Sequence, residues 1–165
     1  MDFLSVIDKY YPPESELRRI LLIHSRQVAD RCLRIAKAHP ELKLDKEFLE
    51  EAAMLHDIGI VRCDAPSIQC FGTEPYIRHG VIGGQMLREE GVDERYARVC
   101  ERHTGTGLPG YEPETLEEKV VCYADKFYSK TRLGAERTVL ETVQSLEKFG
   151  QEGVKRFFSW VDMFE

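Results

Sequence analysis

Imidazole and carboxylate side chains recur where this sequence otherwise places apolar residues. Histidines lie on or end the apolar faces of predicted helices, one opens a short helix, and an aspartate follows the apolar run 120–124. A buried carboxylate without a partner is costly, so these groups need bonded cations or a metal ion. Taken singly, each histidine could be hydrogen-bonded in the core, and Asp125 could pair with Lys126 or Arg132. One shared metal centre would satisfy the whole set, which comprises His24, His56, Asp57, His79, His103 and Asp125.

The donor atoms of this set are nitrogen and oxygen. No cysteine has a suitable spacing, which disfavours a structural zinc site closed by thiolates. Imidazole with carboxylate suits Fe, Mn, Co, Ni or Zn. Six ligands exceed what one catalytic ion with open positions would use, so two ions bridged by Asp57 are attractive. The first would take His24, His56, Asp57 and Asp125, and the second Asp57, His79 and His103; His39 is assigned no role.

Helices must position these residues, because helical periodicity dominates the chain. The predicted helices span residues 14–38, 45–58, 79–90, 93–103, 115–130, 135–149 and 151–164. Residues 60–78 and 104–114 are predicted to be irregular, and no alternating run is long enough to indicate a sheet. We predict an all-α fold: a single domain over residues 1–165 with about six to eight helices. Its metal-binding core would cover about 17–130, with the helices of 135–164 packed on it.

Composition narrows the classes of function. The 165 residues include 23 basic and 29 acidic side chains, a net charge of −6, which is unlike a non-specific nucleic-acid binder. No apolar run approaches the roughly 18 residues of a membrane span, and no secretory signal pattern is present. The five cysteines are an odd number without a C-x-x-C pair, which predicts reduced thiols. We therefore expect a cytoplasmic protein that does not contact membranes.

The ordered set of ligands resembles the HD superfamily of metal-dependent phosphohydrolases. His24, the segment His56-Asp57-Ile58-Gly59 and Asp125 are similar to its HDIG variant, and the resemblance spans residues 17–130. His79 and His103 resemble the additional ligands of a subset with a two-metal centre. Segments 102–110 and 116–125 are similar to hydrolases of that subset that split diadenosine tetraphosphate symmetrically. Mixed-valent di-iron oxygenases, such as myo-inositol oxygenase, carry their ligands in the same order.

The resemblance implies hydrolysis of a phosphomonoester, phosphodiester or pyrophosphate bond by a metal-activated water. His56 and Asp57 would be catalytic, and the expected substrate is a small phosphorylated molecule of the nucleotide class. Two alternatives stay open: a di-iron oxygenase, and a non-catalytic metal-stabilised binding module. The sequence leaves the native metal and the oligomeric state open, with a dimer through the C-terminal helices as one alternative.

An anionic substrate needs cations in an acidic protein. Lys126 and Lys130, one helical turn apart after Asp125, are candidates for binding the substrate phosphate. For each cation, the alternative is a solvated position on the surface. Arg102 beside His103 and Arg78 beside His79 are further candidates. The irregular segment 60–78 is predicted to form a substrate wall, with Phe71 or Tyr76 stacking on a nucleobase or covering the core. The glycine-rich segment 104–110 would admit substrate or simply turn the chain.

Overall fold

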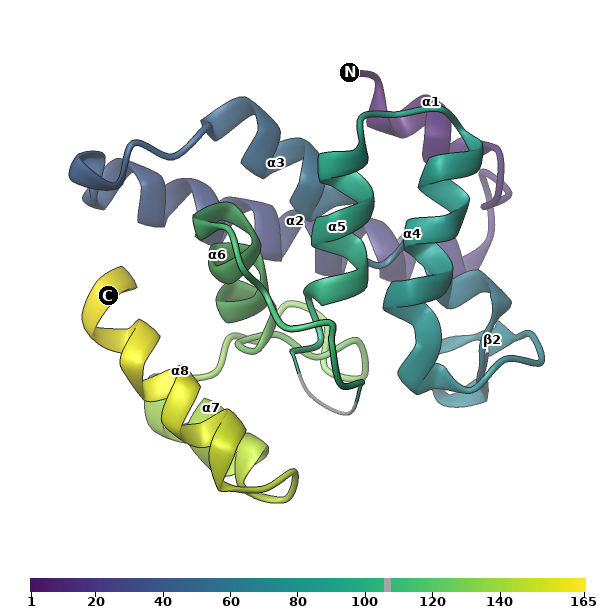
Figure 1. Ribbon diagram of the computed structural model, residues 1–165. Helices are drawn as coiled ribbons and strands as arrows, with labels where there is room; N and C mark the ends of the chain where they lie inside the picture. The colour runs from purple at the N-terminus through teal and green to yellow at the C-terminus, as the bar shows by residue number, and fades with distance from the viewer. Residues whose placement is uncertain (106–107) are drawn as a thin grey trace.

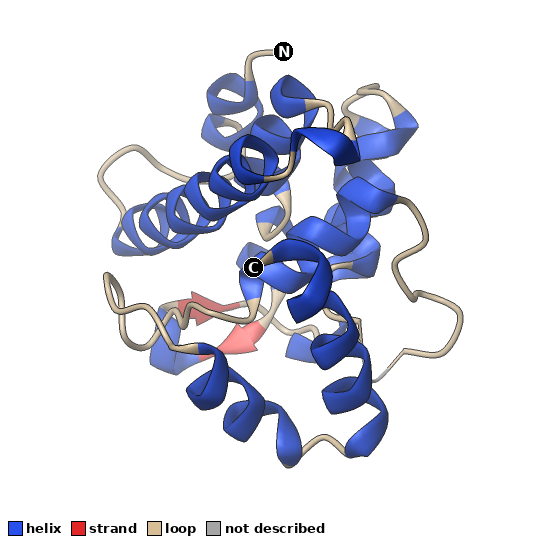
Figure 2. Cartoon of the chain, turned by 90° about the vertical axis from the view of Figure 1, so that its left-hand side faces the viewer, coloured by secondary structure: helices blue, strands red, loops and turns tan. Residues whose placement is uncertain are grey.

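The computed structural model describes residues 1–105 and 108–165. Within these ranges the chain is mainly helical, with one small two-stranded sheet at the edge of the molecule, which confirms the all-α prediction (Figures 1 and 2). The α-helices are α1 (Phe3–Asp8), α2 (Glu16–Ala38), α3 (Lys46–Leu55), α4 (His79–Glu89), α5 (Glu94–Arg102), α6 (Leu116–Asp125), α7 (Val139–Glu147) and α8 (Gln151–Phe164).

The segment predicted to be irregular between α3 and α4 contains short elements. Three 3-10 helices, η2 (Ile58–Arg62), η3 (Pro66–Ile68) and η4 (Tyr76–Arg78), alternate with strands β1 (Asp64–Ala65) and β2 (Cys70–Phe71). The strands pair antiparallel, with Asp64 opposite Phe71. This sheet was not predicted, because strands of two residues are too short to show alternation. A further 3-10 helix, η1 (Pro40–Leu42), follows α2.

Side-chain caps set the starts of the long helices where the sequence predicts them. Ser15 caps α2, Asp45 caps α3, and Thr115 forms a capping box with Glu118 at the start of α6. Three predicted bounds are wrong by three residues or more: the helix predicted over 45–58 ends at Leu55, that over 115–130 ends at Asp125, and that over 135–149 begins at Val139. After α3 and α6 the chain tightens into turns with bonds to the carbonyl three residues earlier, which end the helices at the metal-ligand positions.

The long helix α2 runs across the molecule, with α3 and α6 packed against it, and α4 and α5 form a second pair (Figure 1). The C-terminal helices α7 and α8 pack on each other, and α8 reaches α6 through aromatic side chains. The ring of Phe157 stacks on that of Tyr123 at 4.9 Å between centroids. The organisation as a single domain stays a prediction.

A close contact between backbones fixes η2 against the start of α4. A Cβ atom added to Gly59 would lie 2.1 Å from the carbonyl oxygen of His79 and 2.6 Å from the amide nitrogen of Gly83. Because these neighbours are backbone atoms, they cannot move aside as a flexible side chain would. The absence of a side chain at Gly59 therefore lets the turn that carries Asp57 lie beside His79.

No helix in the described part of the chain is long and apolar enough to cross a membrane.

We expect Gly59→Ala to lower the free energy of unfolding by about 1–3 kcal/mol, because the added methyl group overpacks this contact. Denaturant unfolding measures the change. Gly153→Ala, in the first turn of α8, is the matched control, and it should leave stability unchanged or raise it by up to ~1 kcal/mol. Equal stability of Gly59→Ala and the wild type would contradict the close contact.

Candidate metal centre

Five helices and the turn after α3 bring the six predicted ligands together. One comes from the middle of α2, two follow α3 directly, one opens α4, one follows α5 and one ends α6. Their donor atoms form two groups, in each of which all the atoms lie within 4.8 Å of one another. The groups are His24, His56, Asp57 and Asp125, and Asp57, His79 and His103. They share Asp57, and they coincide with the two ligand sets proposed from the sequence.

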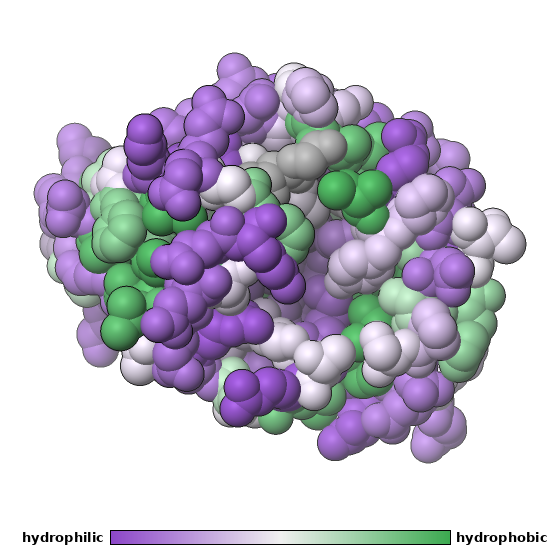
Figure 3. All heavy atoms as spheres, turned by 90° about the horizontal axis from the view of Figure 1, so that it is seen from below, coloured by the Kyte–Doolittle hydropathy of each residue, from purple (hydrophilic) through white to green (hydrophobic). Residues whose placement is uncertain are grey.

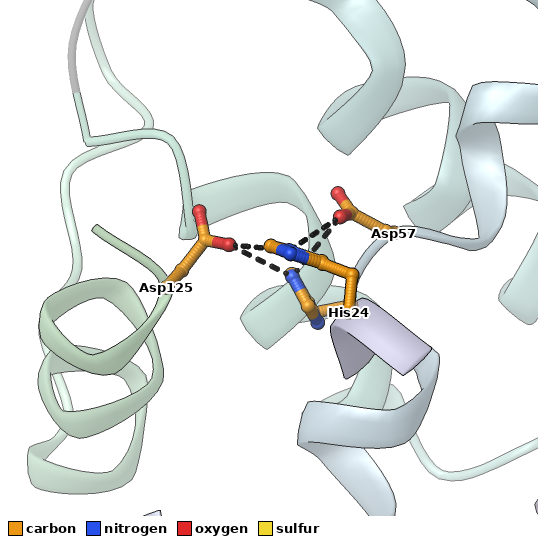
Figure 4. Close-up of side chains that lie close together, drawn as sticks. His24, Asp57 and Asp125 are labelled. Atoms are coloured by element: carbon orange, nitrogen blue, oxygen red, sulfur yellow. Dashed lines mark hydrogen bonds and ion pairs between the residues drawn. The ribbon is translucent and has the colours of Figure 1, made fainter. Parts of the chain in front are cut away.

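In the first group, two imidazoles lie between two carboxylates. The Nε2 atom of His24 is 3.2 Å from Oδ2 of Asp57 and 2.9 Å from Oδ1 of Asp125. Figure 4 shows His24 between the two aspartates, which point toward it from different elements. The Nε2 atom of His56 is 3.2 Å from the same oxygen of Asp57 and 3.2 Å from the same oxygen of Asp125. Four donor atoms thus converge on one point.

The second group uses the other oxygen of Asp57. The Nε2 atoms of His79 and His103 are each 3.2 Å from Asp57 Oδ1, and they are 3.0 Å from each other. The Asp57 side chain is fully buried. Its Oδ2 atom thus faces the imidazoles of the first group, and its Oδ1 atom faces those of the second.

Three of the histidines are held in the same way. The Nδ1–H groups of His56, His79 and His103 donate to the carbonyl oxygen three residues earlier, at 2.5, 2.5 and 2.6 Å. Each of these histidines directly follows a helical segment, where the last carbonyls have no intrahelical partner. The bonds fix the ring orientation and, in the neutral ring, leave the Nε2 lone pair as the free donor.

This geometry fits a metal ion. With their Nδ1 protons engaged, neutral His79 and His103 would face each other with two lone pairs, which repel without a cation between them. Oδ1 of Asp57 is buried beside them and has no hydrogen-bond partner among the described residues. Imidazole nitrogens with carboxylate oxygens are suitable ligands for divalent transition metals. The cluster could therefore hold divalent metal through these six residues.

The protonation states in the metal-free cluster follow from its charges. Burial opposes ionisation of Asp57, but protonated His56 and Lys130 hold the pKa of Asp57 well below its usual range. Burial also opposes protonation of His56, yet Asp57 and Asp125 outweigh it and raise the pKa of His56 to about 10. Burial lowers the pKa of His103 to about 4, so this ring is neutral at pH 7.

The structure brings two of the four predicted substrate cations to the cluster. The Nζ atom of Lys130 donates to Oδ2 of Asp57 at 2.7 Å, and that of Lys126 donates to the carbonyl oxygen of His103 at 3.0 Å. Burial opposes the charge on Lys130, but Asp57 outweighs it and raises the pKa of the ammonium group. Lys130 therefore stays charged at the metal ligands.

The other two predicted substrate cations, Arg78 and Arg102, do not reach the ligand cluster. The guanidinium of Arg102 donates to the carbonyl oxygen of Glu112 at 2.7 Å and pairs with Glu114 at 3.1 Å. Arg78 is exposed at the end of η4, because its neighbour His79 takes the inward position at the start of α4. Neither arginine lines the cleft described next, so the structure offers no support for their predicted role.

A cleft of about 520 Å³ opens at Asp125, Lys126 and Lys130. Seen from below, the surface is hollowed near its centre, with hydrophilic side chains at the hollow (Figure 3). Tyr76 lines the cleft, with its ring 4.4 Å from that of His79, whereas Phe71 is exposed and does not line it. The segment 60–78 therefore lines the cleft in part, and its role as a substrate wall stays a prediction. The glycine-rich segment 104–110 includes Thr106 and Gly107, which lie outside the described residues, so its predicted role stays open.

Sequence reasoning missed two groups of residues that build this region. Tyr11, fully buried, donates to the carbonyl oxygen of Ile58 at 2.6 Å and accepts from the amide of Val61, which holds η2 in place. The only sequence signal was an aromatic residue before a proline pair. The second missed group is the far wall of the cleft, which includes Arg137 and Lys148. No sequence pattern indicates this wall, because only the tertiary fold brings it near α6.

Residues 21–129 match the family model described as HD domain. This chain belongs to the HD domain family. The match covers all six ligand positions, which lie between residues 24 and 125.

Curated relatives share the domain at moderate identity. A tRNA (cytidine(56)-2′-O)-methyltransferase of Picrophilus torridus is 30% identical over 146 residues, which are 76% of this chain and 39% of the relative. An uncharacterized protein of Methanocaldococcus jannaschii is 33% identical over 129 residues, 66% of this chain and 70% of the relative. Ribonuclease Y of Acidothermus cellulolyticus is 33% identical over 125 residues, 72% of this chain and 23% of the relative. The chain thus spans well under half the length of the methyltransferase and of Ribonuclease Y.

We expect metal affinity to rise with pH between about pH 6 and pH 9, because a metal ion must displace the proton of His56. The pKa of that ring is raised to about 10, so the metal-free protein holds the proton across this range. Calorimetry in buffers of different ionisation enthalpy should detect release of about one proton on binding. His39→Gln, outside the cluster, should behave as the wild type. Affinity that does not change with pH would contradict the expected displacement.

Proposed function

We propose that this HD domain is a metal-dependent phosphohydrolase of the HDIG variant. It would hydrolyse a phosphoester or pyrophosphate bond of a small nucleotide. The observation that carries the proposal is the position of Asp57, whose two oxygens face two separate sets of imidazoles beside a cationic cleft. Such a site suits two ions with one bridging carboxylate, and Fe, Mn, Co, Ni or Zn match its donors.

Two divalent ions, when bound, supply a water of lowered pKa and neutralise charge on phosphoryl oxygens. The chain's own residues would hold and orient the substrate. The ammonium group of Lys130 lines the cleft and is bonded to Asp57, so it can meet a phosphoryl oxygen at the ligand cluster. Lys126, bonded to the carbonyl oxygen of His103, lines the same end.

The cysteine side chains favour water over a protein nucleophile. All five cysteines are buried. Burial raises the pKa of the Cys100 thiol well above its usual value, and this thiol is turned to the carbonyl oxygen of His56 at 3.0 Å. A buried neutral thiol is a poor nucleophile, so hydrolysis by water is the better-supported reaction.

The name of one relative fits this class of chemistry, and none of the names fixes a substrate for this chain. Ribonuclease Y is by its name a nuclease, an enzyme that cleaves phosphodiester bonds. The name of the methyltransferase concerns a tRNA nucleotide, but this chain spans only 39% of that protein. Hydrolysis of a phosphate bond is therefore our proposal for this chain. The cytoplasmic location stays a sequence prediction, and the oligomeric state stays open.

A panel of nucleotides tests the reaction by release of phosphate or of a shortened nucleotide. We expect turnover that EDTA abolishes and Mn²⁺ restores, and Asp57→Asn should reduce kcat by about 100-fold or more. His39→Gln is the control. Fully metal-loaded protein that turns over no member of the panel would argue for a binding module. Oxygen uptake with a mixed-valent iron signal would instead indicate a di-iron oxygenase.

The two-ion arrangement predicts a change in metal content. Replacing both His79 and His103 by Ala should remove about half of the bound metal, because the group with His24 and His56 is left complete. Metal analysis by mass spectrometry measures the content, and circular dichroism checks the fold. Unchanged metal content in the double variant would contradict a second ion.

Lys130 offers a separate test of the substrate contact. We expect Lys130→Met to reduce kcat/KM by about 10–100-fold, because a charged hydrogen bond to the phosphate is lost. Metal content should stay that of the wild type. Lys155→Met, on the exposed face of α8, is the matched control. An unchanged kcat/KM in metal-loaded Lys130→Met would exclude this lysine from substrate binding.

A further inference from the structure

The far wall of the cleft comes from a part of the chain that the family match does not reach. The match ends at residue 129, whereas Arg137, Lys148 and Phe149 line the same cleft as Asp125 and Lys130. Membership of the HD family therefore says nothing about what this wall binds. Its chemistry has to be derived from its own side chains.

Two cations of this wall form no ion pair within 4.0 Å in the described part of the chain. Among residues 1–105 and 108–165, the ammonium group of Lys148 has no hydrogen-bond or ion-pair partner, and Arg137 has no carboxylate within 4.0 Å. The Nη1 atom of Arg137 donates to the carbonyl oxygen of Lys126 at 3.0 Å, which holds the guanidinium at the cleft. Glu141 is near enough for the charge of Arg137 to help lower its pKa, but its carboxylate accepts from the amide of Thr138 and forms no ion pair with Arg137 within 4.0 Å. Positive charge thus remains available in a protein of net charge −6.

The cations at the metal end are already engaged. Lys130 is bonded to Asp57, and Lys126 to the carbonyl oxygen of His103. The cleft therefore has one pair of cations bonded at the candidate metal ligands and a second pair at the two ends of α7. A ligand with a single phosphate group needs only the first pair.

An aromatic ring lies beside the second pair. Phe149 is 64% exposed, and its ring centroid is 5.0 Å from Nζ of Lys148. An exposed phenylalanine ring at a cleft offers a flat apolar face on which a nucleobase can stack. A volume of about 520 Å³ is in the range of small-molecule sites.

We propose that Arg137 and Lys148 form a subsite for a second phosphate group, and that Phe149 stacks on the base. The substrate is then a nucleotide with two separate phosphate groups, one at the metal ligands and one at this wall. Guanidinium and ammonium groups recognise phosphate by charge-assisted hydrogen bonds. The inference deepens the proposed phosphohydrolase and rests on it for the identity of the first phosphate site.

Binding of non-hydrolysable ligands tests the subsite on the metal-loaded protein. The probes are phosphonate analogues of adenosine 3′,5′-bisphosphate and of adenosine 5′-monophosphate, in which carbon replaces the ester oxygen. Calorimetry should show the bisphosphonate bound about tenfold more tightly than the monophosphonate. Lys148→Gln should remove most of this preference and leave affinity for the monophosphonate unchanged. Lys155→Gln, on α8, is the matched control and should keep the wild-type preference.

Further variants separate the phosphate subsite from a structural role. Arg137→Gln should also reduce the preference, with circular dichroism as a check on the fold, because Arg137 holds the carbonyl of Lys126. Phe149→Ala should weaken both nucleotide analogues but leave binding of fructose 1,6-bisphosphate unchanged, since that ligand has no base to stack. Equal affinity of the wild type for the two phosphonates, or an unchanged preference in Lys148→Gln, would overturn the inference.

These outcomes are independent of turnover. Preference for the bisphosphonate in a protein that hydrolyses no nucleotide would support the subsite and contradict the proposed reaction. Hydrolysis of a nucleotide without such a preference would support the proposed reaction and contradict the subsite.

Discussion

The constraint on which the rest of the structure depends is the burial of one ionised carboxylate. Asp57 has no exposure to solvent, yet its pKa is held well below the usual range. An ionised carboxylate in such a place must be surrounded by groups that favour its charge. Here four imidazole nitrogens and the ammonium group of Lys130 lie within hydrogen-bonding or ion-pair distance of its two oxygens. Helix packing, the tight turn after α3 and the contact at Gly59 all serve to keep these groups there.

Helix ends explain how a bundle can deliver so many ligands to one point. A histidine that follows a helical turn can donate from Nδ1 to a carbonyl that has lost its intrahelical partner, and its Nε2 atom then points away from the helix. His56, His79 and His103 all use this arrangement. The same bond satisfies a helix terminus and orients a ligand. A local solution to a backbone problem thus becomes the means of building a metal site.

Two parts of the chain line the cleft: one lies inside the HD-family match, and the other follows residue 129. The ligand cluster lies inside the region that matches the HD family, and its six residues could hold divalent metal. The opposite wall comes from the segment after residue 129, which reaches the cluster because aromatic side chains of α8 pack on α6. The proposed metal centre and the proposed second phosphate subsite thus lie on different segments of the chain that face the same cleft.

The sequence by itself determined the all-α class, the main helices and the six metal-ligand candidates. Polar residues on apolar helical faces are visible in the order of residues, as are caps such as Asp45 and Thr115. Tertiary structure decided which cations meet the cluster: Lys130 reaches Asp57, whereas Arg102 is bound by Glu112 and Glu114. It also decided the wall of the cleft and the small sheet. These features depend on contacts between segments distant in the chain, and residue spacing within one helix carries no information about them.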